Sequence, residues 1–290
     1  MSTDAYAAVR VGTGLLADAG VPSPEHDAVL LLAHVRGVDA AQLRADMILR
    51  APVSESEAQR FAGLLEERSR RVPLQHLTGW APFRRLTLAV GPGVFVPRPE
   101  TEVTLDHAIA AIHLATDSGV TNPVVVDLCT GSAAIAIALA TECPMISVHA
   151  VELSREAHAW AERNVALHAP GVDLRLGDAT TAFEDLRGRV DVVVANPPYI
   201  PDDMVPNDPE VRDHDPPVAL YGGGADGLSI PRAVAARAAE LLTPSGTLVM
   251  EHADVQGESL PAALRQAGPW RSVTDHLDLA GRPRVLVAAR

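Results

Sequence analysis

The stretch VVVDLCTGSAAIAIALA, residues 124–140, places β-branched residues before an acid, then a run of small residues, then an apolar segment without breakers. This order predicts a buried strand at 124–128, a tight turn and a helix that packs back on the strand. Small residues in such a turn let a ligand approach the backbone at the carboxyl end of the strand. The stretch therefore predicts an α/β fold with a ligand site at the end of its first strand.

The rest of the second half of the chain repeats this alternation of strand and helix. Further strands are predicted at 146–152, 172–178, 190–195 and 246–253, separated by helical segments such as SREAHAWAERNVALH. Near the end of the chain, SVTDHLDL and PRVLVAA are predicted to pair as an antiparallel hairpin. The pattern indicates a mostly parallel sheet wrapped by helices and closed by an antiparallel pair.

The first third of the chain has a different texture. Residues 2–72 carry signals that start and end helices. They include a capping box from Ser54 to Glu57 that predicts the start of a helix running toward Arg71. Glycines and prolines between 75 and 97 surround the alternating RRLTLAV, which is typical of a hairpin or an extended linker. We therefore predict a small all-α domain at 1–74, a β-hairpin linker at 75–97 and an α/β domain at 98–290.

Composition narrows the class of protein. The chain has 290 residues, 47% of them apolar, without a charge-free apolar run long enough to span a membrane, so we expect a globular cytoplasmic protein. A net charge of −13 disfavours polyphosphate partners, and no direct nucleic-acid binding or membrane association is expected. Cys129 and Cys143 lie apart from any Cys/His cluster, so neither a disulfide framework nor a metal site is predicted.

Acidic residues at successive strand ends predict a nucleoside cofactor. Gly131 lies in the first turn, and Glu152, which ends the next strand, can accept hydrogen bonds from both hydroxyls of a ribose. Asp178 ends the following strand and could receive the amino group of an adenine. A nicotinamide enzyme would be expected to carry G-x-G-x-x-G, whereas this turn has one glycine. S-adenosylmethionine has no pyrophosphate and does not require that cradle.

The segment Asn196-Pro197-Pro198-Tyr199 follows the fourth strand and is predicted to lie at the same edge of the sheet. The Asn196 carboxamide can accept from one N–H of a planar amide or amine, and the Pro197 carbonyl can accept from the other. Two prolines stiffen the segment, and Tyr199 offers a flat face for stacking. Such a segment would align a nitrogen for methyl transfer, and it leaves a protein amide and a nucleic-acid base both open as substrates.

Together with DLCTGS and the Asn-Pro-Pro-Tyr segment, several longer stretches resemble the HemK/PrmC-type release-factor glutamine methyltransferases. These stretches are PLQHLTGWAPFRRLTLAVGPGVFVPRPETE at 73–102, PPVALYGGGADGL at 216–228 and DLAGRPRVLVA at 278–288. The resemblance implies a helical domain that docks the protein substrate, a hairpin linker, and a Rossmann-like, seven-stranded class I methyltransferase domain. It also implies transfer of a methyl group from S-adenosyl-L-methionine, leaving S-adenosyl-L-homocysteine, to the side-chain amide nitrogen (N5) of the glutamine in the Gly-Gly-Gln motif. That motif belongs to bacterial class 1 peptide chain release factors, which act in translation termination, and we expect the enzyme to be a monomer.

The same resemblance assigns roles residue by residue. Asn196, Pro197 and Tyr199 would be catalytic, and Asn196 to Tyr199, including Pro198, would clamp the glutamine amide. The residues implied to hold the cofactor are Cys129, Thr130, Gly131, Ser132, Ala133 and Glu152, with Asp178 and Ala179 beside the adenine and Asn196 touching both cofactor and substrate.

The chain departs from the family pattern at several of these positions. The first turn reads CTGSAA where GTGSGA is commoner, so Cys129 and Ala133 replace glycines. Glu152 stands where aspartate is commoner, and Ala179 stands where many relatives have a bulky aromatic residue. After the fifth strand, EHA at 251–253 replaces the more usual EIG.

Three alternatives to release-factor methylation stay open. The sister activity on a glutamine of a large-subunit ribosomal protein shares the Asn-Pro-Pro-Tyr segment. DNA adenine N6 methylation would use it too, but that reaction requires base flipping and a grip on phosphates, which the acidic charge disfavours. The third alternative is a module that binds a nucleoside without catalysing a reaction, and the altered glycine turn raises this possibility.

Overall fold

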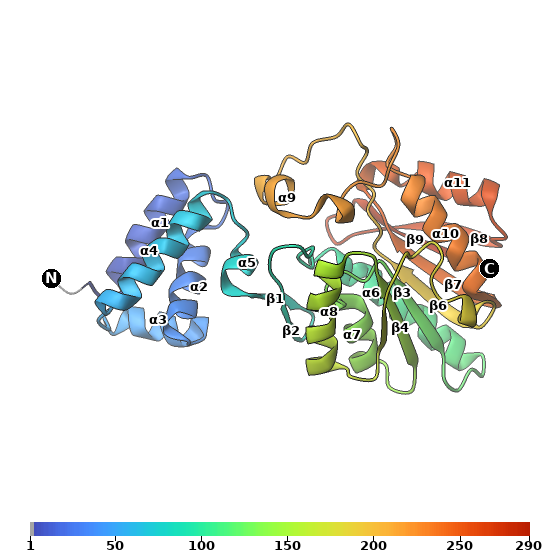
Figure 1. The fold of residues 1–290 in the computed structure, drawn as a ribbon, viewed down its shortest axis with the longest axis horizontal. Helices are drawn as coiled ribbons and strands as arrows, with labels where there is room; N and C mark the ends of the chain where they lie inside the picture. Colours follow the sequence, from blue (N-terminus) through green and yellow to red (C-terminus); the bar gives the residue numbers. More distant parts are fainter. Residues whose placement is uncertain (1–2) are drawn as a thin grey trace. The chain divides into compact units, whose positions relative to one another are not determined.

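The computed structural model describes residues 3–290, which divide into two compact units (Figure 1). The helical unit contains the chain up to Trp80 together with Pro206–His214. The α/β unit contains Ala81–Val205 and Asp215–Arg290. The chain therefore leaves the α/β unit after residue 205, joins the helical unit for a short segment, and returns at residue 215.

Short amphipathic helices build the helical unit. They are α1 (Ala5–Asp18), α2 (Pro24–Arg36), α3 (Ala40–Ile48), α4 (Glu55–Ser69), α5 (Leu74–Thr78) and, from the later segment, α9 (Pro209–His214). The predicted capping box is confirmed, because the Ser54 hydroxyl accepts from the backbone N–H of Glu57 and the Glu57 carboxylate accepts from that of Ser54. Leu16, Leu31 and Phe61 are among the buried side chains that form the core of this unit.

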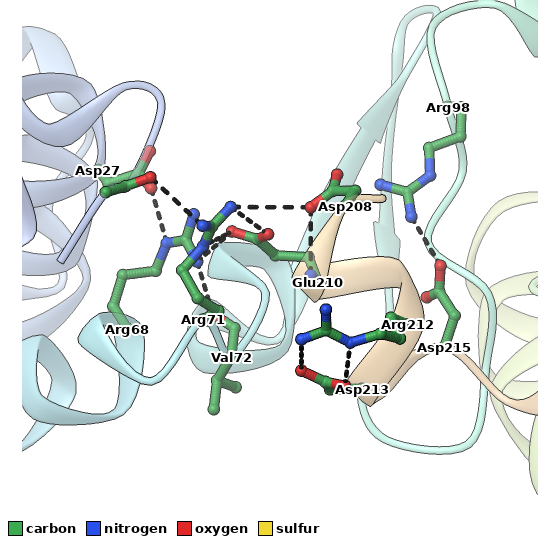
Figure 2. Close-up of polar contacts among 11 residues, drawn as sticks. Asp27, Arg68, Arg71, Val72, Arg98, Asp208, Glu210, Arg212, Asp213 and Asp215 are labelled. Atoms are coloured by element: carbon green, nitrogen blue, oxygen red, sulfur yellow. Dashed lines mark hydrogen bonds and ion pairs between the residues drawn. The ribbon is translucent and has the colours of Figure 1, made fainter. Parts of the chain in front are cut away.

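A buried cluster of ion pairs fastens α9 within the helical unit (Figure 2). The Arg68 guanidinium lies 2.7 Å from Asp27 Oδ2 and 2.7 Å from Glu210 Oε1. Arg71 adds a two-pronged contact, with its Nε 2.7 Å from Glu210 Oε1 and its Nη2 2.5 Å from Oε2. Charges removed from water are stable only when they are paired, so the Glu210 carboxylate is tied to both arginines. This contact accounts for the return of segment 206–214 to the helical unit.

The prediction from sequence placed this segment inside the range 98–290. The structure groups it with the helical unit because the pairing joins residues 139 positions apart, as between Arg71 and Glu210. Local patterns of apolar and polar residues carry no information on such a partner. A short helix, α5, also overlaps the range 75–97 that the sequence assigned to the hairpin linker, and it is capped by Gly79 in a left-handed conformation (φ 80°).

The α/β unit contains, within residues 81–290, a seven-stranded sheet in the order β5-β4-β3-β6-β7-β9-β8. Its strands are β3 (Val124–Leu128), β4 (Ser147–Glu152), β5 (Asp173–Leu176), β6 (Val190–Ala195), β7 (Leu242–Glu251), β8 (Ser272–Leu277) and β9 (Pro283–Ala289). The pairs from β5 to β7 are parallel, and β9 runs antiparallel to both β7 and β8. The mostly parallel sheet with a terminal antiparallel hairpin is thereby confirmed.

Helices cover both faces of this sheet. The helices are α6 (Thr101–Asp117), α7 (Ala134–Glu142), α8 (Arg155–His168), α10 (Ser229–Leu241) and α11 (Ser259–Ala267), with single 3₁₀ turns at Glu184–Leu186, Pro217–Ala219 and Asp254–Gln256. Val125 and Val192 pack in one cluster with residues of α6, α7 and α8, whereas Val126 and Val193 pack in another with residues of α10 and α11. Neighbouring strand residues thus point to opposite faces, which gives three layers and explains the continuous valine runs.

A small hairpin of β1 (Trp80–Phe83) and β2 (Leu86–Ala89) precedes the main sheet, as predicted for the linker. The fully buried Asn164 of α8 holds the end of β2: its Oδ1 accepts from the Ala89 N–H at 2.7 Å, and its Nδ2 donates to the Ala89 carbonyl at 2.9 Å. The same Nδ2 donates to the Ser132 carbonyl at 3.0 Å. One buried amide therefore links β2 to the turn after β3. Over residues 3–290, none of the helices combines the length and apolar character needed to cross a bilayer.

Protonation of Glu210 should weaken the helical unit. Burial alone would raise the pKa of this carboxyl, but the hydrogen bonds from Arg71 and Arg68 outweigh burial and lower the pKa to about 2. A carboxyl with a lowered pKa stabilises the folded state above its ordinary pKa of 4.5, and that stability is lost as the pH falls toward 2. The contribution at neutral pH is at most about 3 kcal/mol.

We expect Glu210→Gln to lower the free energy of unfolding at pH 7 by about 2–3 kcal/mol, because the amide cannot compensate Arg68 and Arg71. The loss should shrink between pH 4.5 and 2, where the native carboxyl is itself protonated. Urea unfolding of the full chain across this pH range measures both effects. Asp213→Asn is the matched control, since Asp213 lies on the same helix in an exposed pair with Arg212. Equal behaviour of the two variants would contradict a stabilising role for the cluster.

Candidate active site

Strand pairing brings the predicted site residues to one edge of the sheet. Leu128, the last residue of β3, is paired with Val151 of β4 on one side and with Ala195 of β6 on the other. The turn 129–133 follows Leu128, Glu152 follows Val151, and Asn196 follows Ala195. They meet at the carboxyl edge, by which we mean the edge where β3, β4, β5 and β6 end. This is also where strand order reverses around β3, the usual ligand position in open α/β sheets.

The turn after β3 adopts an unusual backbone. Cys129, Gly131 and Ala133 all have left-handed conformations, with φ values of 67°, 60° and 65°. Glycine enters this region freely, whereas a residue with a Cβ atom loses roughly 1 kcal/mol there. Ala133 is fully buried in the core on one face, and Cys129 packs against the core on the other. Each buried Cβ regains about 0.8 kcal/mol, so the two replacements of glycine are tolerated by packing.

Glu152 closes this turn from the neighbouring strand. Its Oε2 accepts from the Gly131 N–H at 2.8 Å, and its Oε1 accepts from the Ser154 N–H at 2.8 Å. Burial raises the pKa of the carboxyl, and backbone hydrogen bonds from Ser154, Gly131 and Leu153 oppose that rise. A carboxylate has about four acceptor positions, so three backbone donors leave about one for a ligand hydroxyl. A Cβ atom added to Gly131 would meet no atom within 4 Å, so the space above the turn is open.

Asp127 and Thr130 form a buried pair beneath the turn. The Thr130 hydroxyl donates to Asp127 Oδ2 at 2.5 Å, and the Thr130 N–H donates to the Val151 carbonyl at 3.0 Å. Burial raises the pKa of Asp127 to about 7, although the Thr130 hydroxyl partly offsets the effect. Burial likewise raises the pKa of the Cys129 thiol, which therefore stays protonated. Thr130 and Ser132 are buried, so their side chains shape the turn from below.

Asp178 and Ala179 lie farther along the carboxyl edge, after β5. Asp178 is exposed, and its Oδ1 accepts from the backbone N–H and the hydroxyl of Thr180 at 2.8 and 2.7 Å. Ala179 is buried in the core. The Gly177 N–H donates to the Glu152 carbonyl at 2.9 Å, which ties this loop to the strand end beside it. The structure thus places the predicted adenine-side residues next to Glu152.

The Asn-Pro-Pro-Tyr segment, residues 196–199, leaves β6 at the same edge. Pro197 is buried, and Asn196, Pro198 and Tyr199 are half-buried. Asn196 Nδ2 donates to the Thr101 hydroxyl oxygen at 3.3 Å. The Tyr199 hydroxyl donates to Glu251 Oε1 at 3.5 Å, and burial raises the pKa of this phenol. The segment is therefore held through side chains that the sequence analysis did not single out.

Glu251, which ends β7, is the central member of that missed group. It is 2% exposed, its Oε2 accepts from the Thr104 hydroxyl at 3.2 Å, and the Thr101 hydroxyl also hydrogen-bonds to it. Burial raises the pKa of Glu251, while the two threonines and the charge of Arg284 oppose the rise. An acid at the end of a strand predicted to be buried was a signal that could have identified Glu251. Thr101, in the PETE stretch before α6, offered no comparable signal.

A glycine-rich loop, residues 222–227, packs directly on the backbone of the Asn-Pro-Pro-Tyr segment. A Cβ atom on Gly222 would lie 2.7 Å from the Pro198 carbonyl oxygen, and one on Gly227 would lie 2.2 Å from the Tyr199 carbonyl oxygen. Gln256 Nε2 donates to the carbonyls of Tyr199 and Asp226 at 2.8 and 2.9 Å and so joins the two segments. Backbone contacts this close require glycine, which gives the YGGGADG stretch its structural role.

Solved structures with the same fold identify the class of protein. The hMettl16 catalytic domain, solved in complex with an RNA hairpin, matches 70% of this chain and 74% of its own with a TM-score of 0.53 and 15% identity. The N-terminal domain of human METTL16, solved in complex with SAH, covers 70% of this chain and 75% of its own with a TM-score of 0.50 and 16% identity. At this identity the likeness shows the fold alone. A family model described as a methyltransferase small domain matches residues 86–207, in agreement with the methyltransferase fold.

Closer relatives identify the family. A family model described as the PrmC N-terminal domain matches residues 7–79. The release factor glutamine methyltransferase of Streptomyces coelicolor is 49% identical over 98% of this chain and 97% of its own, and that of Bifidobacterium longum is 43% identical over 97% of each. The chain belongs to the release factor glutamine methyltransferase family. A 4-amino-L-phenylalanine/4-methylamino-L-phenylalanine methyltransferase of Streptomyces pristinaespiralis is 41% identical over 89% of this chain and 84% of its own.

Contact between the two loops yields a prediction for methyl transfer. In Gly227→Ala, the new Cβ would collide with the Tyr199 carbonyl oxygen at 2.2 Å and displace the segment, so we expect transfer to fall at least about tenfold. Gly224→Ala is the matched control, because Gly224 has a similar φ (78° against 67°) but its nearest neighbour is the Ser229 hydroxyl at 3.1 Å. Rates of methyl transfer, with melting temperatures as a check on folding, measure the difference. Equal rates for the two variants would show that the contact does not position the segment.

Proposed function

We propose that this chain methylates the side-chain amide nitrogen (N5) of the glutamine in the Gly-Gly-Gln motif of class 1 peptide chain release factors. The Asn-Pro-Pro-Tyr segment carries the proposal: a stiff, half-buried amide acceptor lies at the carboxyl edge next to the turn 129–133. Relatives that cover nearly the whole chain and are named release factor glutamine methyltransferases support it. The Gly-Gly-Gln glutamine is the specific target that this proposal adds.

The carboxyl edge fits S-adenosylmethionine. The Glu152 carboxylate keeps acceptor capacity for a ribose hydroxyl, and the open space over Gly131 leaves room for the ligand beside the backbone. Cys129 to Ala133 would line one side of the cofactor, and Asp178 with Ala179 would lie at the adenine. The acidic residues at this edge favour a cofactor that carries positive charge over one with a pyrophosphate.

The residues of the chain act by positioning. S-adenosylmethionine, when bound, supplies an electrophilic methyl group on a sulfonium. Asn196 Oδ1 and the Pro197 carbonyl would each accept one N–H of the glutamine amide, which aligns the nitrogen for in-line attack and disperses the positive charge that develops on it. The carbon–sulfur bond breaks as the carbon–nitrogen bond forms, and the nitrogen then releases one proton to water. The hydroxyl of Tyr199 donates to Glu251, and its ring would restrict the orientation in which the planar glutamine amide can approach.

We assign substrate docking to the helical unit. The release factor is a protein, and a catalytic loop of four residues offers too little surface to select it. Residues 7–79 match a domain model that accompanies this family, and the net charge of −13 is suited to a protein partner rather than to DNA. DNA adenine methylation and glutamine methylation of a ribosomal protein are the outcomes against which the proposal is tested.

Product analysis tests the proposal. The purified chain is incubated with methyl-labelled S-adenosylmethionine and a purified class 1 release factor, and peptides are sequenced by mass spectrometry. We expect one methyl group on the Gly-Gly-Gln glutamine, and in Asn196→Ala a rate about a hundredfold lower with an unchanged melting temperature. A ribosomal protein, an adenine-containing DNA and 4-amino-L-phenylalanine are offered in parallel. Faster labelling of any of these, or a mark on another glutamine, would overturn the assignment.

A substitution at Glu152 tests cofactor binding independently of methyl transfer. In Glu152→Gln, an amide N–H would face the backbone N–H of Gly131 or Ser154, which disturbs the turn as well as the ribose contacts. We expect the Kd for S-adenosylhomocysteine, measured by calorimetry, to rise at least about tenfold. Glu162→Gln, an exposed position on α8, serves as the control and should leave the Kd unchanged. A wild-type Kd for Glu152→Gln would remove this residue from the cofactor site.

A further inference from the structure

The direction in which the Asn196 carboxamide faces decides whether it can help the reaction. A carboxamide has an acceptor end and a donor end of nearly the same shape, and only its neighbours fix which end points where. To accept an N–H from a substrate amide, Asn196 must present Oδ1 to the substrate and direct Nδ2 elsewhere. In the structure Nδ2 donates to the hydroxyl oxygen of Thr101 at 3.3 Å.

Thr101 can receive that hydrogen bond only if its own hydrogen is directed away. Its hydroxyl hydrogen-bonds to the carboxylate of Glu251, which in its ionised form accepts and does not donate. The oxygen of Thr101 is then left as an acceptor, so the facing end of Asn196 has to be a donor. A flipped Asn196 would set two oxygens against each other with no hydrogen between them, which is costly at a site where Thr101 is 5% exposed.

Two further hydroxyls use Glu251 as an acceptor. The hydroxyls of Thr104 and Tyr199 donate to its oxygens at 3.2 and 3.5 Å, and the charge of Arg284 opposes the rise that burial causes in the pKa of Glu251. Thr101 and Thr104 lie three residues apart at the start of α6, on one face of the helix, so both hydroxyls reach the same carboxylate. Glu251 itself ends β7 next to β6, whose register pairs Met250 with Ala195, the residue before Asn196.

We propose that Thr101 is a positioning residue which, polarised by Glu251, holds Asn196 with its acceptor end toward the methyl-accepting amide. The inference rests on the proposed function, since it concerns the nitrogen that Asn196 engages. As positive charge develops on that nitrogen, an oxygen beside it stabilises the transition state, whereas a flipped Nδ2 would oppose it. Thr101 therefore acts on the rate of transfer and not on the affinity for either substrate.

The test compares two threonine variants of the full chain. Thr101→Val should lower kcat at least about tenfold and leave KM for release factor and for cofactor within about threefold. Thr116→Val is the matched control, because Thr116 lies on the same helix and its hydroxyl donates to the Ile112 carbonyl at 3.0 Å. It should retain kcat within about threefold, and Thr101→Ser, which keeps the hydroxyl, should restore the wild-type rate to the same margin.

A double variant distinguishes positioning from a general structural role. If Thr101 works through Asn196, then Thr101→Val should cost less than about twofold when it is added to Asn196→Ala. A loss that is the same in both backgrounds would overturn the proposal. So would equal kcat losses in Thr101→Val and Thr116→Val, a failure of Thr101→Ser to recover, or an effect confined to KM.

A measurement without substrate separates this inference from the proposed function. The side-chain amide protons of Asn196 can be assigned by nuclear magnetic resonance as the pair that is missing in Asn196→Ala. We expect them to exchange with water at least about tenfold faster in Thr101→Val than in the wild type, Thr101→Ser or Thr116→Val, because their acceptor is lost. Unchanged exchange would overturn the inference whatever the substrate proves to be. Absence of a mark on the Gly-Gly-Gln glutamine, with exchange accelerated as expected, would overturn the proposed function alone.

Discussion

Parallel pairing of β3 with β6 is the constraint on which the site depends. The two strands are far apart in the sequence, yet their register sets Leu128 beside Ala195 and so brings the turn 129–133 next to Asn196. A slip of one strand by one residue would turn its valines to the opposite faces of the sheet, toward the wrong helices. The hydrophobic cores on the two faces therefore fix not only the fold but also the spacing between the cofactor side and the acceptor side of the carboxyl edge.

The turn after β3 shows how packing compensates for backbone strain. Cys129 and Ala133 hold left-handed conformations that glycine would adopt without loss, and both bury their Cβ atoms in the cores above and below the sheet. The turn keeps its shape because Asn164 binds the Ser132 carbonyl and Glu152 binds the Gly131 N–H. A turn fixed from both ends by buried polar groups requires fewer glycines than one that relies on its own flexibility.

The features that could be predicted from the sequence are those that depend on residues close together in the chain. The strands at 124–128 and 190–195, the capping box at Ser54 and the terminal hairpin depend on neighbours within a few residues, and the structure confirms them. Assembly of the carboxyl edge could be inferred because parallel strands end together. The bonds of Thr101 and Glu251 to the Asn-Pro-Pro-Tyr segment, and the pairing of Glu210 with Arg71, join residues 50 or more positions apart through single polar atoms. Periodicity cannot predict the partners in such contacts, although the position of Glu251 at the end of a predicted buried strand was itself a signal.

The EHA stretch after the fifth strand acquires a physical explanation from the same reasoning. His252 is fully buried where an apolar residue is commoner in the family, and both ring nitrogens have partners: Asp275 Oδ1 at 2.7 Å and the Ala253 carbonyl at 2.8 Å. Arg284 donates to the His252 carbonyl at 3.1 Å, and its charge also favours the ionised form of Glu251. A buried imidazole without partners would strain the end of β7, which Glu251 terminates. The ring nitrogens of His252 bond to β8 and to the loop after β7. His252 therefore does not compete for the Glu251 carboxylate, which accepts from Thr101 and Tyr199.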